Sequence, residues 1–179
     1  MTYYTNSEII DIHIPRWNEI PSLSLYMDQT LQFLKESLPF LAINGQKSFI
    51  TSTMVNNYVN QGIISPPTNK RYSRKHMAYL IVVCILKQVY SMQEIEQLLN
   101  FQYSTYNNER AYDFFCNEFE ACFKSLSLHH EVSHTPSDDE GEFAVFMIRN
   151  VIMSVASKLY TQNNLHSPNL TIPIKNQNP

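Results

Sequence analysis

The chain has 179 residues, of which 44% are hydrophobic, 12% aromatic and 16% charged, and its formal net charge is −3. This length and composition suit one domain, or one domain with an appendage, around a sizeable core. There is no run of about 18 apolar residues, so no membrane-spanning helix is expected. The opening residues MTYYTNSE lack the basic start and the apolar stretch of a signal peptide, and a cytoplasmic location is expected.

The three cysteines, Cys84, Cys116 and Cys122, lie inside apolar segments. Their odd number and apolar setting indicate reduced core thiols in a cytoplasmic protein. A redox pair of Cys116 and Cys122 is the alternative, but a spacing of six residues does not place two side chains on one helix face.

The charges are segregated along the chain. No Asp or Glu occurs between Glu36 and Glu94, an interval that holds six basic residues: Lys47, Lys70, Arg71, Arg74, Lys75 and Lys87. The following segment, residues 94–142, holds eleven acids against two bases. A basic module between acidic ones can attract phosphate locally, and the alternative is a chance cluster on a solvated face.

Residues 1–24 are expected to form an irregular N-terminal extension, because Pro15 and Pro21 interrupt any helix there. Trp17 can anchor this segment to the body of the protein. From Leu25 to Leu41, apolar residues recur at spacings of three, four and seven, which predicts an amphipathic helix with an unfavourable last turn at Pro39. We expect this helix to be the scaffold helix that precedes a recognition helix.

A connector with Gly45 as its turn residue leads to a short predicted helix, which begins at Ser52 or Thr53 as N-cap and ends at Gly62. One face of this helix is apolar. The other carries uncharged amides, where most solvated helices carry Glu and Lys: Asn56, Asn57, Asn60 and Gln61. Such amides can pair with the edge of adenine in the DNA major groove, and the alternative is that they bond to nearby backbone in a weak helix.

Two prolines within residues 63–73 mark a rigid turn that is too short for another helix. We expect Ile64 and Tyr72 to pair across a small hairpin, called the wing below. Lys70 and Arg71 are then at or beside the tip of the wing.

Ser73 is expected to cap a helix whose first turn carries Arg74, Lys75 and His76. Cations at a helix N-terminus oppose the helix dipole, and phosphate contact is one reason to place them there. The alternative is that the wing keeps them solvated, at a cost of about a few tenths of a kcal/mol each. The continuation, residues 77–87, is apolar nearly all round and predicts the central buried helix.

Ser91 and Glu94 form a capping box, which predicts a helix through Leu99. Residues 101–106 are interpreted as an aromatic loop. The next helix is expected to begin at a cap on Asn107 or Asn108 and to run to about residue 126. It carries a stripe of large apolar residues that suits packing or a dimer face, or alternatively an effector pocket: Ala111, Phe115, Phe119, Cys122 and Leu126.

Residues 127–142 are polar and predict a mobile loop. His130 and His134 in it could bind zinc at helical spacing, but the segment is not helical in pattern and no cysteine joins it, so no metal site is expected. Residues 143–160 predict a second strong helix, buried in the fold or against another subunit. Residues 164–179 predict an extended tail.

The sequence resembles two families. Residues 51–99 are similar to the N-terminal half of MerR-type transcriptional regulators, which have a Tyr-bearing helix ending in Gly-Leu-Leu or Gly-Leu-Ile, then prolines, a basic wing and an S-x-x-E-I helix. In that family the helix and wing touch DNA and a C-terminal helix makes the dimer. The residues that carry the resemblance are Tyr58, Gly62, Pro66, Pro67, Arg71, Tyr72, Glu94 and Ile95.

This chain departs from the MerR pattern in having Asn56 and Asn57 where Arg and Tyr are usual, in a shorter wing, and in the lack of a long coiled coil. Most of residues 14–99 is more similar to an uncharacterised family of Gram-positive bacteria, a domain of unknown function, around RWNEIP, LYMDQ, MVNNYV and KRYSR. That resemblance implies a bacterial cytoplasmic protein.

We therefore expect a mainly α protein with a MerR-like winged helix-turn-helix at residues 25–99, a helical C-terminal region at 100–163 for dimerisation or for a small-molecule or protein effector, and no cofactor or metal. The expected function is sequence-specific binding of double-stranded DNA by a homodimer that regulates transcription. Three residues are expected to read bases and six to hold phosphates. The base readers are Asn56, Asn57 and Asn60, and the phosphate set is Ser52, Thr53, Lys70, Arg71, Arg74 and Lys75.

Two other function classes remain as alternatives. The net negative charge favours a protein-interaction module that has kept the winged-helix fold and lost DNA binding. An enzyme is not expected, because three glycines cannot build a glycine-rich phosphate cradle and the chain has no G-x-S-x-G, H-E-x-x-H or paired C-x-x-C motif.

Overall fold

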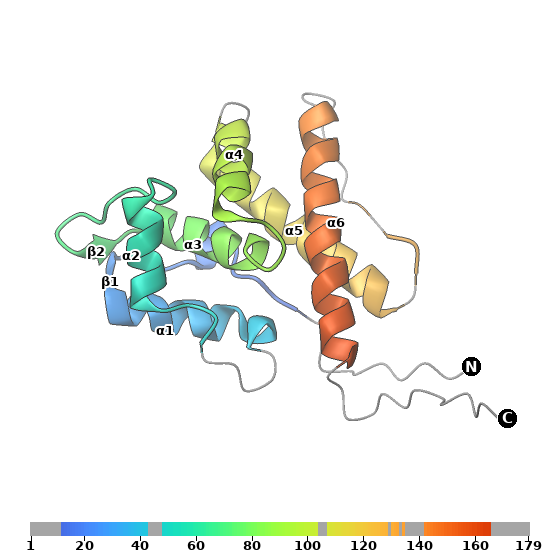
Figure 1. The fold of residues 1–179 in the computed structure, drawn as a ribbon, viewed down its shortest axis with the longest axis horizontal. Coiled ribbons are helices and arrows are strands. Elements are labelled where there is room, and N and C mark those ends of the chain that lie inside the picture. Colours follow the sequence, from blue (N-terminus) through green and yellow to red (C-terminus); the bar gives the residue numbers. More distant parts are fainter. Residues whose placement is uncertain are drawn as a thin grey trace, which may run out of the picture.

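The computed structural model describes residues 12–42, 48–103, 107–128, 130–132, 134 and 142–165. This part of the chain is mainly helical, as the sequence predicts (Figure 1). Its helices are α1 (Met27–Ser37), α2 (Ser52–Asn60), α3 (Arg74–Leu86), α4 (Met92–Tyr103), α5 (Asn108–Ser127) and α6 (Glu142–Leu165). Its two strands, β1 (Leu25–Tyr26) and β2 (Arg71–Tyr72), pair antiparallel.

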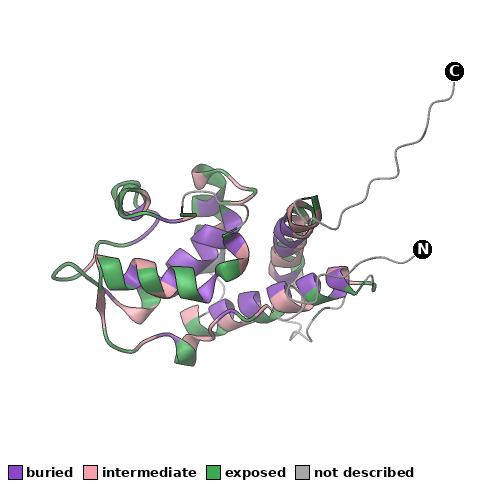
Figure 2. Ribbon diagram, turned by 90° about the horizontal axis from the view of Figure 1, so that it is seen from below, coloured by how far each residue is buried: buried purple, intermediate pink, exposed green. Residues whose placement is uncertain are grey.

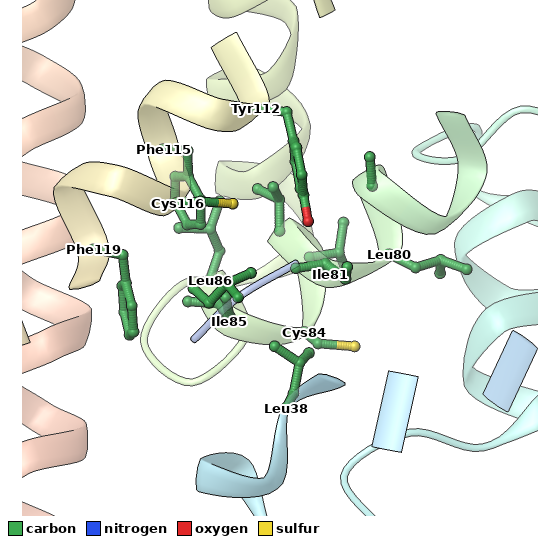
Figure 3. Packing of buried hydrophobic residues seen from close by; sticks show 14 of the residues in the cluster. Leu38, Leu80, Ile81, Cys84, Ile85, Leu86, Tyr112, Phe115, Cys116 and Phe119 are labelled. Carbon is green, nitrogen blue, oxygen red and sulfur yellow. The ribbon is translucent and has the colours of Figure 1, made fainter. Parts of the chain in front are cut away.

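Helix α3 is the centre of the core. All its residues from Met77 to Leu86 are buried except Tyr79, which confirms the predicted central helix. Helices α1, α5 and α6 all contact it. Figure 3 shows the side chains of α3 between Leu38, which follows α1, and the aromatic rings of α5. An apolar side chain buried this completely contributes about 2 kcal/mol to folding, so α3 holds the other elements together.

Helices α5 and α6 pack on each other beside α3 (Figure 1). The predicted stripe on α5 is confirmed as packing, because Phe115, Phe119 and Phe123 stack in succession at centroid distances of 6.3 and 6.1 Å. Helix α6 buries one face, which consists of Val145, Val151, Ile152, Val155, Ala156 and Leu159. Its first turns differ from the expected all-round burial, because Phe143 is 67% and Phe146 is 60% exposed.

Within the described residues, one helical stretch, Phe143–Leu165 of α6, is long and apolar enough to span a bilayer by length and composition. A third of its most apolar window is buried inside the fold. The buried residues of α6 pack against α5, so packing within this fold accounts for part of the apolar composition of α6.

The three cysteines are free thiols buried in the core, as expected. Burial disfavours the charged thiolate and raises the pKa of Cys84 and Cys116 to about 12 and that of Cys122 to about 11. These thiols are therefore protonated at neutral pH.

Several predicted boundaries are wrong. Helix α1 begins at Met27 because Leu25 and Tyr26 belong to β1, and it ends at Ser37 because Pro39 starts a separate 3₁₀ turn, Pro39–Leu41. Residues 101–103 continue α4 instead of starting the predicted aromatic loop. Helix α6 continues to Leu165, into the predicted tail. The expectations for Gly45 and for residues 104–106 and 166–179 lie outside the described residues.

The segment from Ile12 to Ile20 forms a strap along α5. Arg16 donates two hydrogen bonds to the Glu120 carboxylate, at 2.7 and 2.6 Å, and the Trp17 amide donates to Asp113 Oδ1 at 2.7 Å. The Trp17 ring meets Tyr112 edge-on at a centroid distance of 6.2 Å. Trp17 is thus the anchor that the sequence predicts, in a 3₁₀ turn over Trp17–Glu19.

Candidate nucleic-acid interface

Helix α2 is a short amphipathic helix whose buried side contains Val55 and Tyr58. Its N-cap is Thr51, whose Oγ1 accepts from the Met54 amide at 3.3 Å, so the predicted cap at Ser52 or Thr53 is wrong by one or two residues. The shift leaves the side chains of Ser52 and Thr53 exposed in the first turn. Gly62 ends the helix at φ +76°, as predicted, a conformation that favours glycine.

The outward face of α2 consists of amides without hydrogen-bond partners. Asn56, Asn57, Asn60 and Gln61 are all exposed, and their side chains make no hydrogen bond within the described part of the chain. The alternative, that these amides bond to nearby backbone, is therefore not what this structure contains. Their donors and acceptors are open to a ligand, and bidentate pairing of Asn or Gln with adenine needs both.

The small sheet joins residues that are far apart in sequence, and from here on the wing means β1, β2 and the loop of residues 65–70 that leads to β2. Tyr72 of β2 pairs with Leu25 and Arg71 pairs with Tyr26, so the predicted pairing of Ile64 with Tyr72 is wrong. Ile64 instead turns inward and is 2% exposed, and its amide bonds to the Tyr58 carbonyl at 3.2 Å. The loop that leads to β2 projects from one end of the molecule and is mostly exposed (Figure 2).

Lys70 lies at the tip of the wing in a left-handed conformation. Asn69 has φ 51° and Lys70 has φ 62°, and the Arg71 amide closes the turn onto the Thr68 carbonyl at 3.0 Å. Two consecutive positive φ values are typical of a type I′ hairpin turn, for which Asn-Gly is the preferred pair. A lysine in the place of that glycine costs about 1 kcal/mol, because a Cβ is strained in this conformation.

Lys70→Gly is expected to stabilise the protein by about 1 kcal/mol, because glycine adopts this conformation without strain. If the lysine is present for phosphate contact, the same change lowers DNA affinity and reduces the slope of log affinity against log salt by about one. Urea unfolding and a fluorescence anisotropy titration measure the two effects. Asn69→Gly is the matched control, since it alters the same turn and is expected to leave DNA affinity unchanged. The prediction is wrong if Lys70→Gly changes stability and DNA affinity in the same direction.

The Arg71 side chain is exposed and, among the described residues, is held by Tyr26. Its Nη2 donates to the Tyr26 hydroxyl at 2.8 Å, and its guanidinium carbon lies 4.4 Å from the centroid of the Tyr26 ring. Tyr26 is outside the segment that the sequence indicated for this site. The sequence gives almost no signal for including Tyr26 in the site, because a strand of two residues has no detectable alternation of polar and apolar positions.

The basic first turn of α3 is divided between internal and outward roles. Arg74 is half-buried, and its Nε donates to the Ile20 carbonyl at 3.0 Å. One nitrogen of its guanidinium therefore ties α3 to the end of the strap. Lys75 is exposed, with its Nζ 5.8 Å from the Tyr79 ring centroid. His76 is buried, and its two ring nitrogens lie 2.7 Å from Ser73 Oγ and 3.1 Å from Ser65 Oγ. Lys75 therefore remains accessible, whereas His76 has a structural role.

The ion pairs among the described residues lie away from this surface. Within the described residues, no carboxylate forms an ion pair with Lys70, Arg71 or Arg74. The acids of α5 instead bind Arg16 and Arg149. The exposed side chains of Lys70 and Arg71 thus present positive charge that no ion pair among the described residues offsets, and such a local field can attract phosphate.

A family model described as Domain of unknown function (DUF1836) matches residues 15–125, more than half of the chain. The chain belongs to the DUF1836 family. The match confirms the expectation of an uncharacterised domain, and it brings no assigned activity. No curated protein and no solved structure matches the chain significantly.

The DUF1836 match extends from the strap to α5 and so includes α2, the wing and α3, whereas α6 lies outside it. The exposed amides of α2 and the exposed cations of the wing and of α3 are thus part of the family's own domain. Within the described residues, no group of three His, Cys, Asp or Glu side chains could hold a metal ion. Of the two histidines considered for zinc, His134 has its Nδ1 3.0 Å from Glu118 Oε2, and His130 is exposed, with its amide bonded to the Ser125 carbonyl.

Proposed function

We propose that this protein is a MerR-like winged helix-turn-helix transcriptional regulator that binds double-stranded DNA sequence-specifically in the cytoplasm. One observation carries the proposal: the exposed face of α2 is an uncharged row of amides without hydrogen-bond partners, and the wing beside it is basic. Asn56, Asn57 and Asn60 would read base edges in the major groove. A helix of this kind enters the groove, and basic residues around it fix its register on the phosphates.

The phosphate set of this proposal is Ser52, Thr53, Lys70, Arg71, Arg74 and Lys75. Because these side chains differ in exposure, we expect them to contribute unequally to DNA affinity. Lys70, Arg71 and Lys75 are exposed cations, whereas Arg74 gives one nitrogen to the Ile20 carbonyl. The hydroxyls of Ser52 and Thr53 stand at the free N-terminus of α2, where backbone amides also favour an anion. We expect the wing cations to contribute most of the electrostatic affinity.

A homodimer is part of the proposal, because one recognition helix reads one half-site. We assign the dimer contact to the exposed N-terminal turns of α6. Phe143 and Phe146 are mostly exposed, and Phe101 of α4 meets Phe143 edge-on at 6.4 Å, so the aromatic cluster continues onto a second helix. Analytical ultracentrifugation is expected to give a dimer, and Phe146→Glu a monomer of unchanged helical content. A monomeric wild-type protein at micromolar concentration overturns this assignment.

The second candidate is a protein-interaction module on the same scaffold. The overall charge of −3 and the asparagines at 56 and 57, where MerR proteins usually have Arg and Tyr, favour it. In that case the basic surface would bind an acidic protein segment.

Fluorescence anisotropy with a duplex from the upstream region of the protein's own gene separates the two candidates. The titration is repeated over a salt series and in the presence of random competitor DNA. A regulator gives binding that resists competitor and weakens steeply with salt. Equal, weak binding to every sequence, or none at low salt, transfers the proposal to the interaction module.

A further inference from the structure

Tyr26 and Arg71 form a cross-strand pair on the exposed face of the small sheet. They are direct partners in the β1–β2 register, so their side chains are on the same face. Their neighbours Leu25 and Tyr72 are on the opposite face, where Tyr72 is 3% exposed. The pair thus belongs to the outer surface of the wing and not to the core.

The contact fixes the position of the guanidinium without using its ligand-binding capacity. An exposed arginine samples many rotamers, and stacking on a ring with a hydrogen bond to its hydroxyl restricts them. Nη2 donates to the Tyr26 hydroxyl at 2.8 Å, which leaves the N–H donors of Nε and Nη1 open. A planar cation that is already oriented loses less entropy when it binds an anionic oxygen.

We propose that Tyr26 is a positioning residue for Arg71, and that the ligand of the oriented guanidinium is a backbone phosphate of DNA. This inference rests on the proposed function and adds a residue from β1 to the site. Tyr26 acts through Arg71 and does not itself touch the DNA.

A purely structural role for the pair predicts a different outcome. Tyr26 is 49% exposed and Arg71 is exposed, and pairs of this kind at the surface contribute little to folding. Removing the Tyr26 ring should therefore leave the unfolding midpoint in urea nearly unchanged. The effect should instead be on DNA affinity.

A double-mutant cycle tests the inference with the upstream duplex as the probe. Tyr26→Leu is expected to weaken binding about tenfold, and Tyr26→Phe, which keeps the ring, about twofold. Arg71→Gln lowers the salt slope by about one, whereas Tyr26→Leu lowers affinity with the slope nearly unchanged, since the charge of Arg71 remains. In the Arg71→Gln background, Tyr26→Leu is expected to have no further effect.

Each outcome decides the inference. Equal losses from Tyr26→Leu in both backgrounds mean that Tyr26 contacts DNA itself and overturn the positioning role, as does unchanged affinity in Tyr26→Leu. A wild-type protein that does not bind the duplex overturns the proposed function and this inference with it. The ring-current shift of the Arg71 side-chain protons, measured by NMR without DNA, is expected in wild type and Tyr26→Phe and absent in Tyr26→Leu. If wild type shows the ring-current shift but Tyr26→Leu binds DNA as tightly as wild type, only the role of Tyr26 is refuted.

Discussion

Replacing both Lys70 and Arg71 with glutamate is expected to abolish DNA binding while the helical content stays intact. The double change removes two phosphate contacts from each protomer and puts two anions next to the DNA backbone. Any residual binding should have a slope of log affinity against log salt that is lower by about two per protomer. Both side chains are exposed, and the hydrogen bond and the ring contact of the Arg71 side chain within the described residues are with the exposed Tyr26, so the core does not depend on them.

Fluorescence anisotropy at low salt measures this loss, and circular dichroism checks the fold. The matched control replaces Lys35 of α1 and Lys124 of α5 with glutamate, which makes the same change in net charge at exposed positions away from the wing. The control is expected to lower affinity only modestly through the general field. If the wing variant keeps its affinity, or if the control loses as much, Lys70 and Arg71 are not the phosphate contacts.

The helices were predictable because their determinants are local. The buried run of α3, the capping box at Ser91 and Glu94 and the stop at Gly62 each depend on residues within a few positions of one another. Glu94 accepts from the Ser91 amide at 2.7 Å, as that motif requires. Hydrophobic periodicity and capping chemistry therefore sufficed for these elements, although their ends moved by a few residues.

The wing was predicted only in part, because its pairing joins distant residues. Lys70 lies at the tip and Arg71 beside it, as expected, but the strand that pairs with β2 is β1, which precedes α1 and α2 in the sequence. Ile64 was the nearest apolar candidate in sequence, and the fold buries it instead. A pairing between two-residue strands, some 45 residues apart, leaves no local pattern from which Tyr26 could be found.

The electrostatic contacts of the strap and of α5 were also invisible in the sequence. In the sequence, Glu118 and Glu120 are only two members of the acidic segment at residues 94–142, and nothing there indicates their partners. In the fold, Glu120 binds Arg16, 104 residues away, and Glu118 binds Arg149 of α6. Composition reports the net charge of a segment, but only the tertiary structure decides which of its charges are paired and buried.

Glu118→Ala is expected to destabilise the protein by about 3 kcal/mol, because it removes the anion of a buried charge cluster. Glu118 is 1% exposed, Arg149 Nε donates to its Oε2 at 3.1 Å, and His134 Nδ1 lies 3.0 Å from the same oxygen. The change leaves the mostly buried Arg149 without this carboxylate and also opens a small space in α5. Urea unfolding measures the loss.

Glu96→Ala is the matched control, since Glu96 is exposed on α4 and its loss should change stability by less than about 0.5 kcal/mol. A combined change of Glu118→Leu and Arg149→Met tests the cause. It replaces the whole ion pair with apolar groups and is expected to recover much of the stability, because the cost arises from an unbalanced buried charge and not from a missing attraction. If the double variant is less stable than Glu118→Ala, the contribution of this cluster is the hydrogen-bonded geometry that joins α5 to α6.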